Sequence, residues 1–179
     1  DPELSRGLGD VYKRQGEVPL RTTPVESGED EGLPLSSIVD IYDVIIDDLI
    51  YASENCWARN ESGLELGRAT NTAAHALLAK VYTRIASCKR TAEEGNEGNS
   101  LYLAFPESYQ TYYQYAKEQC DAALNGSGYA LKTNLADWVS IFDADNGNNE
   151  EMLFDIQGSS LSGPVSYTHL TLPTTRCGV

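Results

Sequence analysis

Residues 70–87 read TNTAAHALLAKVYTRIAS, and almost every side of the helix they would form is apolar. Lys80 and Thr83 leave only a narrow polar strip on that helix. A helix of this kind is buried between others, and its many alanines allow neighbouring helices to approach closely. The run therefore predicts the central helix of a mainly α-helical domain.

A second helix is predicted upstream, beginning at Ser36 or Ser37, because either hydroxyl can cap a helix N-terminus. Apolar residues then recur at helical spacing from Ile38 to Ala52. The opposite face carries three aspartates, which are Asp40, Asp43 and Asp47. Carboxylates at this spacing can hold a cation, but no histidine or second acidic cluster lies nearby. We interpret them as a solvated helix face.

Polar residues follow the central helix over positions 89–100, and they include Gly95 and Gly98. This composition predicts a flexible excursion between helices. A third helix is predicted from Pro106, which can occupy a first helical turn, to a cap at Asn125. Its apolar and aromatic residues keep the helical period.

The last part of the chain shows shorter patterns. Residues 128–131 predict an extended piece, residues 135–142 a short helix and residues 152–156 a short strand. The expected fold class is mainly α, with antiparallel helix pairs, long loops and a short C-terminal strand.

Both ends of the chain resemble translated sequencing-library adapter. Residues 5–15 read SRGLGDVYKRQ and match the arm and mosaic end used by a common transposase library kit, and residues 165–173, VSYTHLTLP, match the opposite adapter. We therefore interpret residues 1–15 and 165–179 as adapter-derived artefacts. Residues 16–164 are then an internal piece of a helical domain.

The charge of the chain is strongly acidic. It has 13 basic and 27 acidic residues and a formal net charge of −14. Four of the basic and three of the acidic residues lie in the two ends, so residues 16–164 carry −15. Such a surface repels phosphate backbones and anionic lipids, and nucleic-acid binding is not expected. No apolar run approaches the roughly 18–20 residues of a membrane span.

Metal and cofactor signals are weak. The one histidine outside the ends, His75, is interpreted as a packed or hydrogen-bonded helix residue. Three cysteines remain there, and we expect buried free thiols at Cys56, Cys88 and Cys120. The acidic turn over residues 143–150 resembles an EF-hand loop only superficially, since Gly147 and Asn148 occupy its fifth and sixth positions. We predict no metal and no other cofactor.

Five blocks, taken in order, resemble the SusD/RagB family of outer-membrane nutrient-binding lipoproteins of Gram-negative bacteria. They are residues 18–20, 39–52, 67–82, 116–131 and 149–157. The resemblance implies tetratricopeptide-like helix pairs over residues 16–164. It also implies a protein lipid-anchored at the cell surface, which captures oligosaccharides or other nutrients for a SusC-like TonB-dependent transporter. It implies no catalytic residues and a lipoprotein cysteine upstream of this chain.

Sugar sites are generally aromatic platforms flanked by amide and acidic side chains. Tyr82, Tyr112 and Tyr113 keep helical spacing, so we expect them in the core. Trp57 and Tyr102 fall in predicted loops. These two residues are the candidate ligand-binding residues.

Two other functions fit less well. A tetratricopeptide-type adaptor that binds proteins should repeat every 34 residues, and the units that begin at Thr70 and Pro106 show no such copy. A helical glycoside hydrolase needs two carboxylic acids roughly 5–10 Å apart across a cleft. The acids here fall on a polar helix face and in turns.

Overall fold

The computed structural model describes residues 16–23, 32–59, 67–125, 127–142 and 146–154. Its helices are α2 (Ile38–Asn55), α3 (Asn71–Glu93), the 3-10 helix η2 (Glu97–Ala104), α4 (Tyr109–Leu124) and α5 (Leu135–Ser140). Within these residues β-pairing is limited to an isolated antiparallel bridge between Val18 and Ser36. The mainly helical prediction is confirmed. The two adapter-like ends lie outside the described residues.

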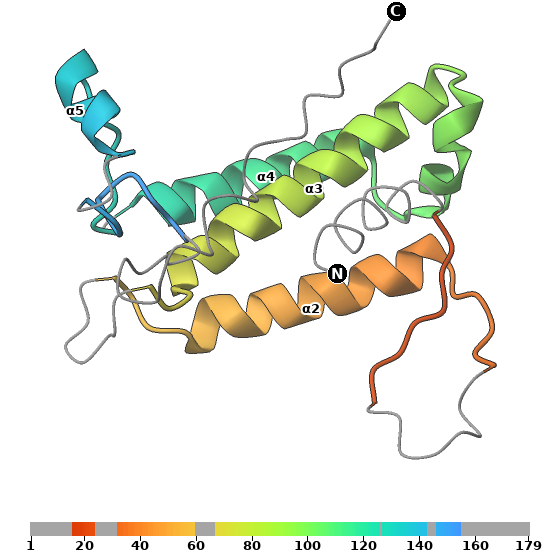
Figure 1. Cartoon of the computed structure of the whole chain (residues 1–179). Helices are drawn as coiled ribbons and strands as arrows, with labels where there is room; N and C mark the ends of the chain where they lie inside the picture. The colour runs from red at the N-terminus through yellow and green to blue at the C-terminus, as the bar shows by residue number, and fades with distance from the viewer. Residues whose placement is uncertain (1–15, 24–31, 60–66, 126, 143–145, 155–179) are drawn as a thin grey trace, which may run out of the picture.

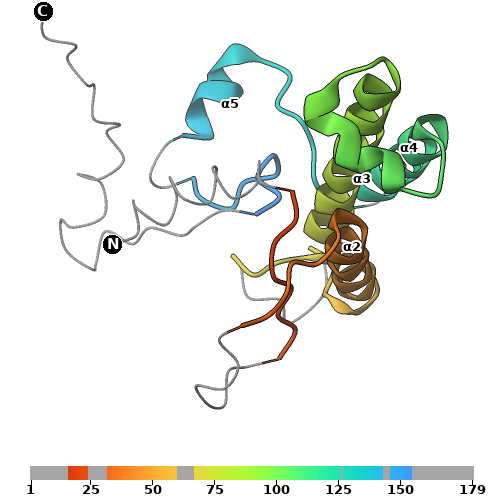
Figure 2. The ribbon, with the colours of Figure 1, turned by 90° about the vertical axis from the view of Figure 1, so that its right-hand side faces the viewer.

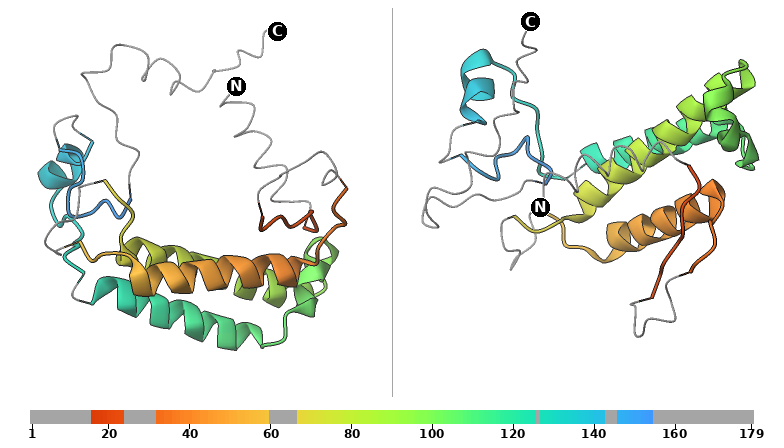
Figure 3. Two further views of the ribbon diagram at one scale, coloured as in Figure 1. Left: turned by 90° about the horizontal axis from the view of Figure 1, so that it is seen from below. Right: turned by 45° about the vertical axis from the view of Figure 1, so that its right-hand side comes forward.

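The long helices form one antiparallel layer with α3 in the middle (Figures 1 and 3). α2 and α4 both pack on α3, and η2 covers the end where α3 finishes and α2 begins. This arrangement confirms the prediction that residues 70–87 form the central helix. Leu77 of α3 nevertheless remains 48% exposed, because neither neighbouring helix covers its side of α3.

A side-chain hydroxyl caps the start of each long helix. These caps are Ser37, Thr70 and Ser108. Each oxygen accepts a hydrogen bond from a backbone N–H three residues later, which satisfies a donor that the helix leaves free. The prediction that Pro106 lies in the first turn of the third helix is wrong, because the cap at Ser108 makes Tyr109 the first helical residue.

The predicted excursion over residues 89–100 is also wrong for most of its length. α3 continues to Glu93 and η2 begins at Glu97, so only a short turn separates them. Lys89 is buried with its ammonium donating to the carbonyl of Phe105, which lets its aliphatic stem pack inside. The turn follows at Gly95, whose φ of +96° is a conformation that glycine adopts without strain.

The core lies where α2, α3, η2 and α4 meet. Its buried members are Ile38, Ile85, Ala86, Cys88, Tyr102, Phe105 and Tyr112. Ile85 is fully buried, and burying a side chain of this size stabilises a fold by about 1.5–3 kcal/mol. Tyr42 of α2 packs edge-on against Phe105, with ring centroids 5.5 Å apart. Aromatic packing therefore joins α2 to the segment between α3 and α4.

The C-terminal part stands apart from the helical layer (Figure 2). Its short helix is confirmed as α5. The strand predicted over residues 152–156 is not formed at positions 152–154, where Met152 N–H closes a turn on the carbonyl of Asn149 at 3.2 Å. Positions 155 and 156 lie outside the described residues.

Candidate ligand-binding site

Trp57 lies at the surface directly after α2. Its side chain is 47% exposed. Its backbone is held in place, because the Trp57 carbonyl accepts a hydrogen bond from the N–H of Asn71 at 3.1 Å, at the start of α3. The sequence placed Trp57 in a loop, and the structure gives that loop a fixed point of attachment.

Tyr102 does not lie in a loop, and that part of the prediction is wrong. It belongs to η2 and is only 8% exposed. Its ring stacks on Phe105 at 5.7 Å between centroids, and its hydroxyl bonds to that of Tyr42 at 3.1 Å. Of the two predicted residues, Trp57 therefore has its ring at the surface and Tyr102 has its ring in the core.

Sequence reasoning missed a second exposed aromatic group, on α5 and just after it. Trp138 is 46% exposed and Phe142 is 68% exposed, and their rings meet edge to face at 5.3 Å. Helical spacing of aromatics usually indicates packing, so residues 135–142 gave no sign of exposure. A useful signal was the shortness of α5. A helix of six residues that carries several large apolar side chains has no polar face to turn toward water, so some of these side chains must lie at the surface.

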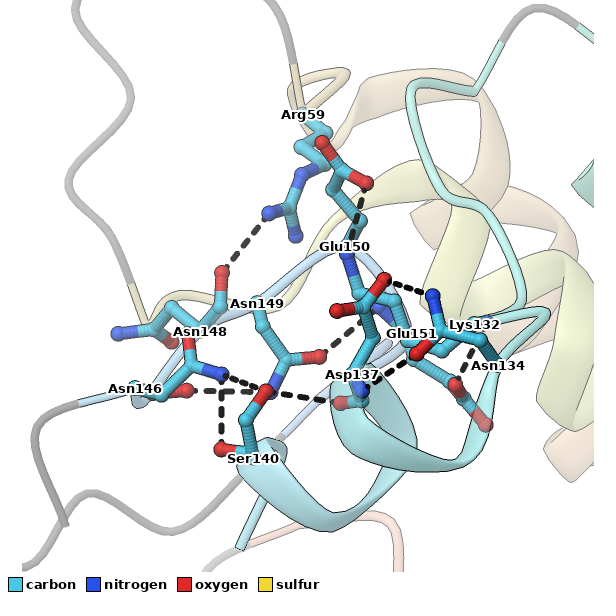
Figure 4. A network of polar contacts seen from close by, with 10 residues as sticks. All are labelled: Arg59, Lys132, Asn134, Asp137, Ser140, Asn146, Asn148, Asn149, Glu150 and Glu151. Carbon is cyan, nitrogen blue, oxygen red and sulfur yellow. Dashed lines mark hydrogen bonds and ion pairs between the residues drawn. The ribbon is translucent and has the colours of Figure 1, made fainter. Parts of the chain in front are cut away.

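A network of amides supports α5 at both of its ends (Figure 4). At the start, Asn134 accepts from the N–H of Asp137 at 2.9 Å, and its amide donates to the Asp137 carboxylate at 2.6 Å. At the other end, the Asn146 amide donates to the carbonyl of Ser140 at 2.8 Å. Asn149 donates to the carbonyl of Asn146 at 3.1 Å. The turn after α5 is thus fixed to the helix that carries Trp138.

Arg59 connects this turn to the Trp57 segment (Figure 4). Its guanidinium donates to the carbonyl of Asn148 at 2.8 Å and lies over the ring of Tyr129, 4.5 Å from the centroid. The Tyr129 hydroxyl in turn donates to the Leu153 carbonyl at 3.2 Å. Three segments that are distant in the sequence are therefore joined at one end of the helical layer.

Lys132 adds a second connection to the same turn (Figure 4). Its ammonium lies 3.1 Å from the Glu150 carboxylate, and its backbone N–H donates to the carboxylate of Glu151 at 3.0 Å. Glu150 is the one acid of the predicted turn over residues 143–150 that lies among the described residues, and it is paired with Lys132, while Glu151 directly after the turn accepts the backbone N–H of Lys132. The described residues contain no group of three or more metal-binding side chains.

The histidine and cysteine predictions have mixed outcomes. His75 is confirmed as a hydrogen-bonded helix residue, with its Nδ1 2.8 Å from the Oε1 of Gln119 on α4. All three cysteines are free thiols, and Cys88 is buried as expected. Cys56 is only partly buried and Cys120 is exposed, so burial of all three was wrong. Cys120 keeps the helical period of α4, but its side chain lies at the exposed surface of that helix.

Surface aromatic rings beside fixed amides and carboxylates suit polar ligands that also have apolar faces. Ring faces cover C–H surfaces, while amides and acids orient hydroxyl groups. Trp57 and Trp138 supply such rings, and the amide and acidic side chains drawn in Figure 4 supply polar groups around α5.

Comparison with known proteins identifies a relative of similar sequence. A "SusD-like protein" of Bacteroides ovatus is 35% identical over 126 residues, which is 69% of this chain and 19% of that relative. The chain thus matches about a fifth of the relative's length. No protein-family model matches the chain. No solved structure matches it. The shared sequence and the helical layer agree with the family resemblance of the five blocks, and the chain belongs to the SusD-like family.

Proposed function

We propose that the protein to which this chain belongs is a cell-surface binding protein for oligosaccharides or other nutrients. It passes its ligand to a SusC-like TonB-dependent outer-membrane transporter and is held at the membrane by a lipid anchor. The family supports this proposal. No helix in the described ranges has the length and apolarity needed to cross a bilayer.

The observation that carries the proposal is the exposed ring of Trp57 on a fixed backbone. A half-exposed tryptophan whose carbonyl is bonded to the start of α3 loses little freedom when a ligand stacks on it. Stacking on an aromatic side chain contributes about 1–3 kcal/mol in nucleic-acid complexes, and we expect the same scale for a sugar ring. Trp138 is a second platform of the same kind.

Calorimetry of the full-length protein against a panel of glycans tests the proposal. Trp57→Ala should weaken binding by about 1–3 kcal/mol, and Trp57→Phe should retain part of the affinity because it retains a ring. Tyr51→Ala is the matched control, since Tyr51 is also an exposed aromatic residue but lies on α2. Unchanged binding by Trp57→Ala would remove Trp57 from the site.

Binding should leave the ligand intact and should not depend on a metal ion. Chromatography of the incubated glycan is expected to show no product, and EDTA is expected to leave the affinity unchanged. Cleaved sugar would refute the non-enzymatic proposal. Loss of binding in EDTA would instead indicate a metal site in the acidic turn that begins at residue 143.

The transporter partnership is tested separately. Co-expression with a SusC-like TonB-dependent transporter from the source organism should yield a complex that survives purification from the outer membrane. Failure of the two proteins to copurify, with glycan binding intact, would remove delivery from the proposal and leave capture in place.

A further inference from the structure

Two contacts hold the short segment that carries Trp57 after the end of α2. The Trp57 carbonyl accepts a hydrogen bond from the N–H of Asn71 at 3.1 Å, and this contact joins the segment to the start of α3. Two residues after Trp57, the Arg59 guanidinium donates to the carbonyl of Asn148 at 2.8 Å. The first contact joins two backbone atoms, whereas the second needs a long side chain with a donor at its end. Substitution of Arg59 therefore removes the second contact and keeps the first.

These contacts belong to a closed ring of interactions that includes Tyr129. The Arg59 guanidinium lies over the Tyr129 ring, 4.5 Å from its centroid. The Tyr129 hydroxyl lies 3.2 Å from the hydroxyl of Thr70, which directly precedes Asn71. From Trp57 the contacts pass through the start of α3 to Tyr129 and return through Arg59. Both ends of the segment over residues 57–59 are thus attached to groups that contact each other.

The two sides of this ring of interactions differ in burial. Thr70 is 2% exposed, and Arg59 and Tyr129 are partly buried. A guanidinium is attracted more strongly to a tyrosine ring where water is excluded. The Trp57 side chain lies at the surface instead, and among the described residues no aromatic ring packs on it. Its orientation therefore depends largely on how firmly its backbone is held.

We propose that Arg59 is a positioning residue for the Trp57 ring and acts on it through Tyr129. With its guanidinium over the Tyr129 ring, Arg59 holds the backbone of residues 57–59, and the indole keeps one orientation at the surface. A ring that is already ordered loses less conformational freedom when a ligand stacks on it. That a sugar is this ligand rests on the proposed function, whereas the ordering of the ring requires no ligand.

Fluorescence anisotropy decay of the full chain tests the ordering of the ring. The chain has two tryptophans, so Trp138→Phe leaves Trp57 as the single reporter. In that background Arg59→Ala should add a fast local motion of the indole. Arg59→Lys should suppress part of this motion, because a lysine also places a cation over the Tyr129 ring. Arg90→Ala is the matched control, since it removes an exposed arginine from the last turn of α3 and should leave the decay unchanged.

A double-mutant cycle shows whether Arg59 acts through Tyr129. Tyr129→Leu removes the ring and should produce the same fast motion as Arg59→Ala. The two changes together should add nothing further, because each removes the same contact. Tyr129→Phe keeps a ring beneath the guanidinium and should retain most of the order.

An unchanged decay in Arg59→Ala would overturn the inference, and so would effects of Arg59→Ala and Tyr129→Leu that simply add. Circular dichroism checks that each variant keeps its helices. Arg59→Gln, which keeps a donor but has no charge, takes the place of Arg59→Ala if that variant loses helical content.

Calorimetry of the full-length protein relates the ordered ring to binding, with cellohexaose and maltohexaose as neutral probes. Arg59→Ala should weaken binding by about two- to tenfold, the cost of ordering one further side chain. Unchanged affinity in Arg59→Ala, together with a loss in Trp57→Ala, would contradict the positioning role. If the unsubstituted protein binds neither probe, glucan capture fails as its function, and the anisotropy decay still decides the role of Arg59.

Discussion

The guanidinium of Arg59 lies over the ring of Tyr129, 4.5 Å from its centroid, and so joins the segment after α2 to the segment after α4. The same side chain donates to the carbonyl of Asn148. The Tyr129 hydroxyl adds contacts to Thr70 and to the Leu153 carbonyl, each at 3.2 Å. This end of the molecule is held by polar contacts, whereas the other end is held by the apolar core.

Arg59→Ala should loosen the turn over residues 146–153 and lower the free energy of unfolding by about 1–3 kcal/mol. It removes a cation–π contact and a charge-assisted hydrogen bond. Hydrogen exchange should accelerate at residues 146–153 and remain unchanged in the middle of α3. Arg90→Ala is the control, since the Arg90 side chain forms an exposed contact with Glu94, and such pairs contribute little to stability. Unchanged exchange in Arg59→Ala would show that the turn is held without this residue.

Ala79→Asp should cost several kcal/mol in stability. Ala79 is 3% exposed on α3, and an aspartate there places an unpaired charge in a helix interface. Ala122→Asp makes the same change at an exposed position of α4, and Asp43→Ala removes a charge from the exposed face of α2. Both controls should change stability by under about 0.5 kcal/mol. Chemical denaturation measures all three, and similar losses would contradict the assigned faces.

The chain should lose stability at alkaline pH through Tyr42. Burial, followed by the hydrogen bond with Tyr102, raises the pKa of Tyr42 above its usual value of about 10 in the folded chain. The unfolded chain therefore releases this proton first as the pH rises. This stabilising contribution is complete below about pH 10 and falls by up to about 1.4 kcal/mol per pH unit above it, until the folded chain also loses the proton.

Tyr42→Phe should reduce that alkaline loss, although it costs about 1 kcal/mol at neutral pH by removing the bond to Tyr102. The measurement is denaturant unfolding between neutral pH and pH values above about 10. Tyr51→Phe serves as the comparison, because Tyr51 is exposed. Identical pH slopes for the parent chain and Tyr42→Phe would exclude Tyr42 as the titrating group.

Removal of residues 1–15 and 165–179 should leave the melting temperature unchanged. Neither end contains a periodic apolar pattern that can join a core. Calorimetry of the full and trimmed chains makes the comparison, and a fall of several degrees would show that the ends contribute to packing.

Local patterns were enough to predict that α2, α3, α4 and α5 exist, but not η2. Ser37 and Thr70 are short polar residues in front of periodic apolar runs, and a cap bond needs only a backbone N–H three residues away. The central position of α3 also followed from its own composition, because a helix that is apolar on nearly every side is stable only between neighbours. The end of α3 did not follow, since burial of Lys89 depends on a carbonyl sixteen positions later.

The exposure of the candidate platforms was decided by tertiary contacts. Trp57 and Tyr102 looked equivalent in the sequence, as aromatic residues outside the helical patterns. η2 folds onto α2, so Tyr42 and Phe105 cover Tyr102, while among the described residues no aromatic ring packs on Trp57, which is 47% exposed. Trp138 shows the converse, because it has helical spacing and still lies at the surface of α5. Periodicity shows which side chains share one face of a helix. Whether that face is exposed depends on which distant segment packs on it. A local sequence pattern contains no information on such contacts.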